Sequence, residues 1–541
     1  MPISIQLPDI PDAERTPLVE QLVVLIEALA EENHRLAETV QQLRDEIAVL
    51  KGEKPKPTFK PSGMERPCDP EAPGDAADEP TGRRAGSAKR HKTRDLIIHE
   101  DCPVPPSPPP PPNARFKGYR DFVVQDLKIQ PHNIRYRLEV WQTPDGEWWC
   151  GQLPPTLEGG HFGPGLRAYV LYQHHHCHVT QPLLCEQLRE WGIDLSVGQI
   201  DALLSGHNEG FFAEKDRLLE VGLAVSSFIT VDDSGARHQG RNGYVTQIGN
   251  DFFAWFSSTE SKSRINFLQL LQAGTPFYGM NDEALGYWRE QGLPQALRQA
   301  LMAHPTAAIM TADAWEQHLD DLGLVTERHR RIATEGALLG GLLTKGLSRE
   351  LAIVSDGAGQ FAILLHALCW VHAERLIHKL IPLNERHRQD QERVRDELWT
   401  LYADLKAYQR DPHPAAIAEL RARFEALFTQ KTSFVTLNQT LKRLHAHQAE
   451  LLLVLLRPDI PLHTNGSEND IRGYVKWRKI SGGTRSDLGR RCRDTFASLK
   501  KTCRKLGISF WDYLNDRIGQ VGAIPPLPEI VRERGLAAAV P

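Results

Sequence analysis

Three acidic residues have the residue type and the setting that divalent-metal chemistry requires. Asp232 and Asp356 each follow a run of apolar and β-branched residues, and Glu468 lies near the start of a predicted helix. Chemistry in α/β proteins is concentrated at the carboxyl ends of strands. Mg²⁺ and Mn²⁺ prefer oxygen ligands, and two such ions can activate a hydroxyl and stabilise the leaving oxygen of a phosphodiester. We therefore expect the three carboxylates to converge on two Mg²⁺ (or Mn²⁺) ions as a catalytic and metal-binding triad.

Asp356 also has a simpler explanation. The Asp356-Gly357 pair makes a good turn whether or not the carboxylate binds a ligand, so this segment alone leaves both explanations open. The order of the acids along the chain, on a strand, on a later strand and then on a helix, favours a ligand role and suits a ribonuclease-H-like core. The chain between successive acids is far longer than one crossover needs, so we expect inserted helical segments.

Three further residues are expected to support this site. Asp233 is the neighbour of the first catalytic acid. Cys369 and His372 lie three residues apart on a helix predicted after the second strand, so their side chains share one face beside the end of that strand. We expect Cys369 and His372 to set the helix against the strand that carries Asp356, rather than to bind zinc.

Metal ligation elsewhere is not expected. Cys102 and Cys150 stand where a zinc knuckle would have paired cysteines, but their partner positions hold other residue types, so a tetrahedral site cannot close. The run from His174 to His178 also suggests a metal site. Neighbouring residues on a helix point in different directions, and we expect these side chains at a helix end, near phosphate or solvent.

Basic residues gather in the C-terminal part of the chain. Residues 465–505 contain twelve Lys or Arg against four Asp or Glu, although the whole chain has a net charge of -5. This local excess permits a nucleic-acid partner. The residues expected to contact DNA phosphates are Arg472, Lys476, Arg478, Lys479 and Arg485. A second basic cluster, at residues 83–94, is equally well explained as a DNA contact or as a solvated charge run.

Residues 161–222 are predicted to form a helix-turn-helix region. Thr180 can cap one helix, which ends near Gly192, and Ser196 and Gln199 form a capping box that opens the next. Short capped helices joined by a tight turn are typical of helix-turn-helix DNA-binding motifs and also of ordinary helical domains. We include Thr180, Ser196 and Gln199 among the candidate DNA-binding residues.

The N-terminal segment carries a heptad repeat. β-branched residues with one Asn at the a positions and Leu at every d position favour a parallel two-stranded coiled coil, in which the Asn fixes the register. We therefore predict a homodimer, as a task with two DNA ends would use. The dimerisation residues are Val19, Leu22, Ile26, Leu29, Asn33, Leu36, Val40, Leu43, Ile47 and Leu50.

The sequence predicts a multidomain α/β protein. Eight scattered cysteines fit reduced thiols, and the chain shows neither a secretory leader nor a membrane-spanning run, so we expect a cytoplasmic protein. The predicted segments are a leucine-zipper coiled coil (1–52), a Pro-rich basic linker (53–115), a small β module (116–160), the helix-turn-helix region (161–222), the first part of the core (223–375) with a helical insertion at 273–350, a helical insertion (376–460), the C-terminal part of the core (461–520) and a tail (521–541).

Several motifs together resemble one known family. These are the leucine zipper, Phe162-Gly163-Pro164-Gly165-Leu166, Val231-Asp232-Asp233-Ser234, Ser355-Asp356-Gly357, Cys369-Trp370-Val371-His372-Ala373-Glu374-Arg375 and the segment from Leu462 to Asn469. With them, nearly the whole chain resembles a bacterial DDE-type transposase of the insertion-sequence-66 family. The sequence departs from the family at Asn469, which replaces an Arg, in its depleted zinc cysteines and in its long 273–350 insertion.

The resemblance implies a function. It implies an enzyme that binds the terminal inverted repeats of an insertion sequence, cuts the 3′ ends by hydrolysis and joins them to target DNA. Such an enzyme would work in the bacterial cytoplasm at the nucleoid. Accessory proteins encoded by the same insertion sequence could be its partners. It makes Asp232, rather than Asp233, the first catalytic acid. Two alternatives use the same residues: an inactive relative that binds DNA as a zipper dimer, and a two-metal nuclease without strand transfer.

Overall fold

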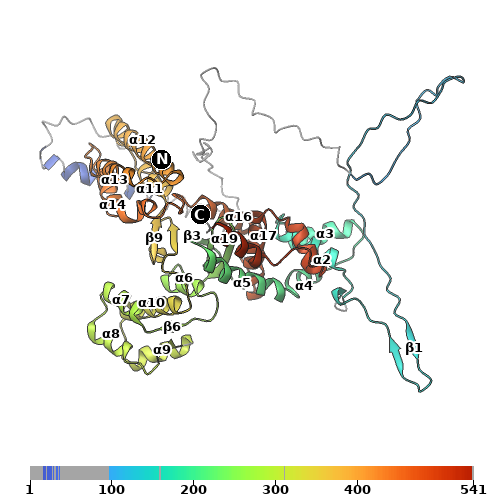
Figure 1. Cartoon of the computed structure of the whole chain (residues 1–541), viewed down its shortest axis with the longest axis horizontal. Helices are drawn as coiled ribbons and strands as arrows, with labels where there is room; N and C mark the ends of the chain where they lie inside the picture. Colours follow the sequence, from blue (N-terminus) through green and yellow to red (C-terminus); the bar gives the residue numbers. More distant parts are fainter. Residues whose placement is uncertain are drawn as a thin grey trace. The chain divides into compact units, whose positions relative to one another are not determined.

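The computed structural model describes residues 97–157, 160–306, 308–309 and 311–538, with Thr16 and parts of the stretch from 18 to 36. Contacts divide the chain into two compact units, Met1–Thr39 with Ile134–Pro541, and Val40–Asn133. In the second unit the described residues, 97–133, form no helix or strand. The elements named below belong to the first unit (Figure 1).

A five-stranded mixed sheet carries the candidate site. Its order is β5-β4-β3-β8-β9, with β3, β4 and β5 antiparallel and both β8 and β9 parallel to β3. The strands are β3 (Phe228–Gly235), β4 (Tyr244–Gly249), β5 (Ala254–Thr259), β8 (Ala352–Ser355) and β9 (Leu365–Leu368). The strand predicted before Asp232 and the later strand predicted before Asp356 are therefore confirmed as β3 and β8.

The sheet also corrects the prediction in two places. β3 does not end before Asp232, because Asp232 and Asp233 pair with Gln247 and Thr246 of β4. Asp232 therefore lies inside a strand and not at its tip. β9 was not predicted, and Cys369, which was expected on the following helix, is instead the N-cap of α11 (Trp370–His378).

Alternate residues of β3 face two different layers. Ile229 and Val231 are buried in the main apolar core, which includes residues of α5 (Glu209–Val225), α6 (Arg264–Leu271) and α10 (Glu327–Thr344). On the other face, Ser467 Oγ of α16 (Asn465–Ser481) donates to Thr230 Oγ1 at 2.5 Å. The basic helix α17 (Asp487–Leu506) packs against β5, and its Lys501 Nζ lies 3.4 Å from Asp470 Oδ1 of α16, which is next to it in Figure 1.

The predicted 273–350 insertion is mainly helical, as expected. It contains α7 (Asp282–Glu290), α8 (Gln295–Met302), α9 (Ala312–Asp321) and α10, with a short ladder of β6 (Tyr278–Gly279) and β7 (Ala308–Ile309). Two buried tryptophans join α7 and α9 to α10. The Trp288 indole of α7 donates to Ala333 O at 3.0 Å, and the Trp315 indole of α9 donates to Thr334 Oγ1 at 2.9 Å.

The second insertion is also helical. It comprises α12 (Glu385–Arg410), α13 (Pro414–Thr429), α14 (Val435–His445), α15 (Gln448–Leu451) and the 3₁₀ turn η5 (Leu453–Leu455). The last of its long helices ends at His445, and only a short helix and a 3₁₀ turn follow. The run from Leu451 to Leu455 is buried in the apolar core of this insertion, and Tyr408 OH donates to Leu455 O at 2.9 Å, so tertiary packing determines its path.

The region before the sheet contains a short hairpin, β1 (Val140–Gln142) with β2 (Trp148–Cys150), within the predicted small β module. The 3₁₀ turn η3 (Pro155–Leu157) follows. Three helices come next, α2 (Pro164–His175), α3 (Gln181–Glu190) and α4 (Val197–Ser205). The capping box of Ser196 with Gln199 is present, whereas Thr180 is the N-cap of α3 without a side-chain capping bond.

The C-terminal segment is more ordered than the predicted tail. After α18 (Phe510–Ile518), residues 527–538 form helix α19 (Leu527–Ala538), which packs on α5. Leu527 and Val531 are fully buried in the main core. Within the described part of the chain, no helix is long and apolar enough to cross a membrane.

Part of the predicted zipper is described. Its described residues between 18 and 36 are helical, and Leu22, Leu29 and Leu36 are about half exposed, at 49%, 56% and 55%. The heptad positions Val40, Leu43, Ile47 and Leu50, and the basic cluster at 83–94, lie outside the described residues.

Candidate active site

The register of the sheet brings the two aspartates to one face. β3 and β8 are parallel neighbours, with Thr230 opposite Val354. Asp232 lies two residues after Thr230 on the same face of β3, and Asp356 is the first residue after β8, two positions after Val354. The helix that carries Glu468 covers this face, since its residue Ser467 bonds to Thr230.

The charges of Asp356 and Glu468 both act on Asp232. The pKa of Asp232 is raised to about 7, first by burial and then by the negative charge of Asp356, with a smaller contribution from Glu468. Uncompensated carboxylates that share a site raise one another's pKa in this way. A cation placed among them would reverse this effect.

Asp356 makes the turn and also faces the site. Its Oδ1 accepts the Ala358 N–H at 3.0 Å, and Gly357 has a φ of +96°, so the Asp-Gly turn explanation is correct as far as it goes. Its charge nevertheless acts on Asp232. Ser355, directly before it, is fully buried, and its Oγ lies 2.8 Å from His366 Nε2 of β9. The two explanations are therefore compatible.

Glu468 faces a cation supplied by another helix. Arg375 of α11 donates through Nη2 to Glu468 Oε2 at 3.2 Å, and its Nη1 lies 3.2 Å from Oε1. His372 Nε2 is 3.6 Å from Oε1 of Glu468 and 3.0 Å from Arg375 Nη1. Burial and the neighbouring guanidinium lower the pKa of His372, so its neutral ring accepts the Arg375 N–H.

Asp233 points away from the triad, on the other face of β3. Its carboxylate forms an ion pair with Lys262, and its Oδ2 accepts a hydrogen bond from Gln360 Nε2 at 2.7 Å. Its backbone N–H, by contrast, donates to Asp232 Oδ1 at 2.7 Å. Asp233 therefore contacts the first acid through its backbone and not through its side chain.

Cys369 and His372 flank the connection between α11 and β8. The Cys369 N–H donates to Ser355 O at 2.9 Å, which joins the helix start to the strand end that precedes Asp356. The Cys369 thiol is buried, and burial raises its pKa. These contacts support the predicted positioning role, and His372 extends it to the Arg375–Glu468 pair.

The donor types suit a hard divalent cation, but the side chains are not gathered around one position. Among the residues that the structure describes, no three His, Cys, Asp or Glu side chains form a group that could hold a metal ion. The pKa of Asp232 is raised first by burial and then by the charge of Asp356, so a bound cation would favour its ionised form. Asp232 and Asp356 fit a metal best, and Glu468 would have to exchange its arginine partner for it.

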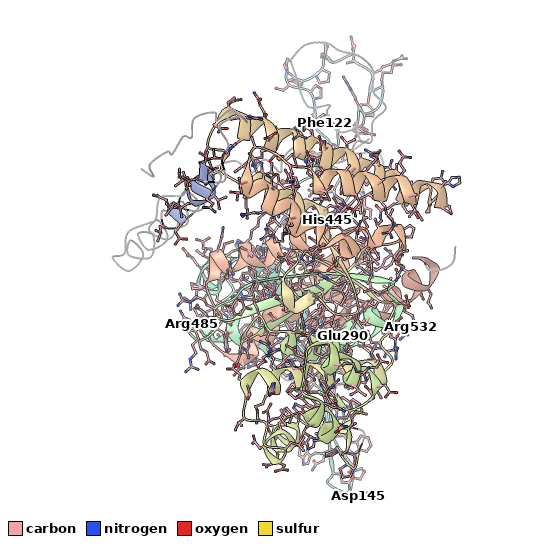
Figure 2. The ribbon with its side chains drawn as sticks, turned by 90° about the vertical axis from the view of Figure 1, so that its left-hand side faces the viewer. Phe122, Asp145, Glu290, His445, Arg485 and Arg532 are labelled. Carbon is pink, nitrogen blue, oxygen red and sulfur yellow. The ribbon has the colours of Figure 1, made fainter. Side chains whose placement is uncertain are left out.

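The predicted DNA-contacting residues fall into two groups. Arg472, Lys476, Arg478 and Lys479 lie along α16, beyond Glu468, and Arg485 is exposed in the turn after it (Figure 2). In the region of α3 and α4, the side chains of Ser196 and Gln199 bond to each other's backbone N–H groups.

The structure corrects the expected surroundings of part of the histidine run, although the run does lie at the end of α2 and His176 is exposed. His175 is 3% exposed, and its ring stacks on Phe496 of α17 with 4.2 Å between centroids. His174 and His178 pack against the ring of Trp477 on α16. This histidine cluster is therefore part of the packing between α2 and the two basic helices.

Sequence reasoning missed Arg375, Lys262 and Gln360. Arg375 stood inside a quoted motif, three residues after His372, and that spacing could have marked it as a neighbour on the same helix face. Lys262 and Gln360 lie in connecting segments without a local signal, and only the fold brings them to Asp233.

Comparison with known proteins now identifies the family. A family model described as "Transposase IS66 family" matches residues 325–491, a range that includes Asp356, Arg375 and Glu468. The chain belongs to the IS66 transposase family. This family suggests a DNA-cutting enzyme that depends on a divalent metal. The chain is also 44% identical over 317 residues to "Uncharacterized protein y4jO" of Sinorhizobium fredii (strain NBRC 101917 / NGR234). The matched residues make up 58% of this chain and 99% of that relative.

Proposed function

We propose that this IS66-family chain is a DNA transposase that binds the terminal inverted repeats of an insertion sequence, cuts its 3′ ends and transfers them to target DNA. Two observations support the proposal: the helix that carries Glu468 is bonded to the strand that carries Asp232 through Ser467 and Thr230, and burial, followed by the charges of Asp356 and Glu468, raises the pKa of Asp232. An antiparallel meander extended by two strands parallel to β3 supports a ribonuclease-H-like core around these acids.

Asp232, Asp356 and Glu468 would hold two Mg²⁺ or Mn²⁺ ions. When bound, such ions activate the attacking water or 3′-hydroxyl and stabilise the leaving oxygen of the phosphodiester. The chain's own part is to hold the acids in place. Thr230 anchors the start of α16 through Ser467, and the Cys369 N–H anchors α11 on the end of β8.

The cations on α16 would position DNA. Arg472, Lys476, Lys479 and Arg485 are exposed, and Arg478 is partly exposed, so they can reach the phosphates of a strand that passes the acids. Phosphate contacts fix the register of the DNA but carry little sequence information. Recognition of the inverted repeat would fall to the α3–α4 region, where Thr180, Ser196 and Gln199 lie at helix starts.

The decisive experiment separates cleavage from binding. Asp232→Ala and Asp356→Ala should abolish Mg²⁺-dependent cleavage of DNA that contains the element's ends, while end binding in a mobility-shift assay is retained. Unchanged cleavage in either variant would refute the assignment. Pre-cut ends supplied with target DNA then distinguish a transposase, which yields joined product, from a nuclease, which yields none. An inactive relative would bind the ends and cleave nothing in the wild type.

A further inference from the structure

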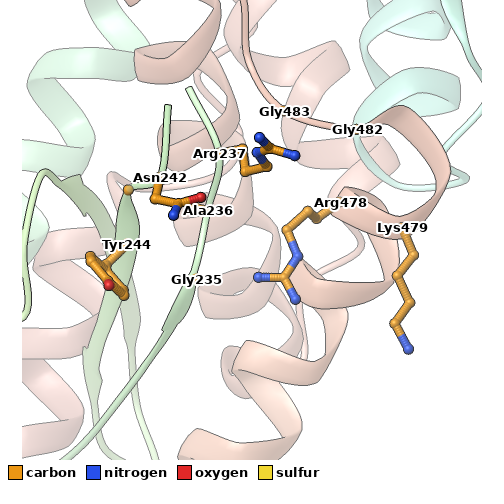
Figure 3. A pocket seen from close by; sticks show the side chains of 10 residues that line it. Gly235, Ala236, Arg237, Asn242, Tyr244, Arg478, Lys479, Gly482 and Gly483 are labelled. Carbon is orange, nitrogen blue, oxygen red and sulfur yellow. The ribbon is translucent and has the colours of Figure 1, made fainter. Parts of the chain in front are cut away.

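A cavity of about 370 Å³ opens at the far end of β3, next to the candidate site. It is formed by the β3–β4 hairpin on one side and by the end of α16 with the following turn on the other (Figure 3). Its lining residues are Gly235, Ala236, Arg237, Asn242, Gly243, Tyr244, Arg478, Lys479, Gly482 and Gly483. We propose that this cavity binds one unpaired nucleotide of the DNA strand that is cut, a proposal that rests on the proposed function.

The charge of the lining selects an anion. Three of its side chains are cationic, Arg237, Arg478 and Lys479, and none of the ten lining residues is acidic. Arg478 reaches from α16 toward β3, with its Nη1 3.4 Å from Ser234 Oγ (Figure 3). Arginine presents several donors in a fixed plane that match phosphate oxygens, so this wall suits a phosphodiester.

The aromatic ring of Tyr244 supplies a surface for the base. It lines the cavity from β4 and is partly exposed. Lys262 Nζ lies 5.5 Å from the centre of the ring, and the same ammonium pairs with Asp233. Single strands are bound in this manner, by cations along the backbone and by aromatic rings on which unpaired bases stack.

The walls are held in place before any ligand arrives. The hairpin is bound to the turn after α16, because Gln239 N–H donates to Thr484 O at 2.8 Å and Thr484 N–H donates to Arg237 O at 3.1 Å. A Cβ at Gly483 would lie 2.6 Å from Arg237 O, so only glycine permits this approach. A rigid site loses less entropy on binding than one that must be ordered.

The position of the cavity indicates which nucleotide would enter. Gly235 lines it at the end of β3, three residues after Asp232, and Arg478 belongs to the helix that carries Glu468. A strand whose phosphodiester lies at the acids would therefore place a nearby nucleotide at the cavity. Unpaired ends are the easiest place for a nucleotide to enter such a site, because no base pair has to be broken.

Binding of two short DNA probes to the full-length protein tests the inference. One probe is a blunt duplex, and the other is the same duplex with an unpaired 3′ tail. The wild type should bind the tailed probe more tightly. Tyr244→Ala should reduce binding of the tailed probe by about 5-fold to 100-fold, the range that one stacked base provides, and leave the blunt probe unaffected. Tyr244→Phe keeps the ring and should behave as the wild type.

Two cation variants complete the test. Arg237 is exposed, so Arg237→Ala should fold even if Tyr244→Ala does not, and it should weaken binding of the tailed probe and lower the salt dependence by about one ion. The matched control is Lys442→Ala, which removes an exposed cation from α14 and should change nothing. Equal binding of the two probes by the wild type, or a tail preference that survives both Tyr244→Ala and Arg237→Ala, would overturn the inference.

The outcome is separable from that of the proposed function. Asp232→Ala should keep the tail preference while it loses cleavage. If Asp232→Ala still cleaves, the catalytic assignment fails whatever the cavity binds. If cleavage depends on Asp232 but the tail preference does not depend on Tyr244 or Arg237, the cavity inference alone fails.

Discussion

Arg375 holds Glu468 in a two-point contact, with 3.2 Å between each guanidinium nitrogen and its facing carboxylate oxygen. The two residues come from α11 and α16, and both side chains are largely buried, at 24% and 13% exposed. This pair neutralises the acid that the proposed metal site requires. It therefore sets up a competition between an internal cation and a bound one.

Arg375→Ala should move stability and metal affinity in opposite directions. Loss of a charge-assisted contact should lower the free energy of unfolding of the metal-free protein by about 1–3 kcal/mol. The half-saturating Mg²⁺ concentration should fall severalfold, because one positive charge near the metal is removed and Glu468 is released. Urea unfolding in chelator and Mg²⁺ titration of the protein measure the two quantities.

Arg395→Ala is the matched control. Arg395 Nε donates to Glu374 Oε1 at 2.6 Å, a pair of similar burial between α12 and α11 that does not touch Glu468. Its loss should also destabilise the protein but leave the Mg²⁺ midpoint unchanged. An Mg²⁺ midpoint that is the same in Arg375→Ala as in the wild type would contradict the competition.

The raised pKa of Asp232 predicts a specific dependence of stability on pH. An acid with a pKa of about 7 in the fold and an ordinary value of 3.8 is favoured in its protonated form by folding. The contribution of Asp232 to the free energy of unfolding is therefore fully present below pH 3.8, the ordinary pKa of the side chain. It is lost as the pH rises through about 7, the pKa of the side chain in the fold. In chelator, the wild type should lose stability between about pH 5 and about pH 8 relative to Asp232→Asn, whose side chain does not titrate.

Saturating Mg²⁺ should reduce this difference, because a bound cation stabilises the ionised carboxylate. The measurement is urea unfolding of both proteins at the two pH values, with and without the metal. Parallel pH dependences of the wild type and Asp232→Asn in chelator would show that Asp232 is not held among uncompensated charges.

Local sequence signals predicted the strands before Asp232 and Asp356 and most helical segments, but not the contacts that complete the site. The β-branched run before Asp232 located β3, yet its end was set too early because the pairing of Asp232 with Gln247 depends on β4. β9 has the sequence Leu-His-Ala-Leu, which carries no strand signal by itself, and it forms because β8 offers a parallel edge.

Long-range contacts explain the other errors. Arg375 and Glu468 are 93 residues apart in sequence, and no periodicity links them. His175 is buried by Phe496, a residue of the distant helix α17, so a solvent position inferred from its own helix was wrong. The residue type and the predicted element type of each of the three acids could be read locally, and their role as a triad stays a prediction.

Glycine 341 tests the packing of the first insertion. A Cβ at Gly341 of α10 would overlap the Phe277 carbonyl oxygen, because the helix and the chain leading into β6 approach closely there. Gly341→Ala should therefore cost about 2–3 kcal/mol of unfolding free energy. Gly286 of α7 is the control, as no atom lies within 4 Å of its added Cβ, and Gly286→Ala should stabilise the helix by about 0.5–1 kcal/mol. Equal effects of the two substitutions in urea unfolding would exclude the close approach.

The exposed leucines of the N-terminal helix predict its oligomeric state. Leu22, Leu29 and Leu36 share the d position of the heptad and are about half exposed in the single chain, so a second copy of this helix would bury them. Sedimentation of the full-length protein at micromolar concentration should give a dimer, and removal of residues 1–52 should give a monomer.

Replacing both Leu22 and Leu29 by Asp should have the same effect without shortening the chain, because charges at facing d positions repel across the interface. Replacing the exposed Lys442 of α14 by Asp is the control and should leave the dimer intact. A full-length monomer, or a dimer that survives the removal of residues 1–52, would contradict the zipper.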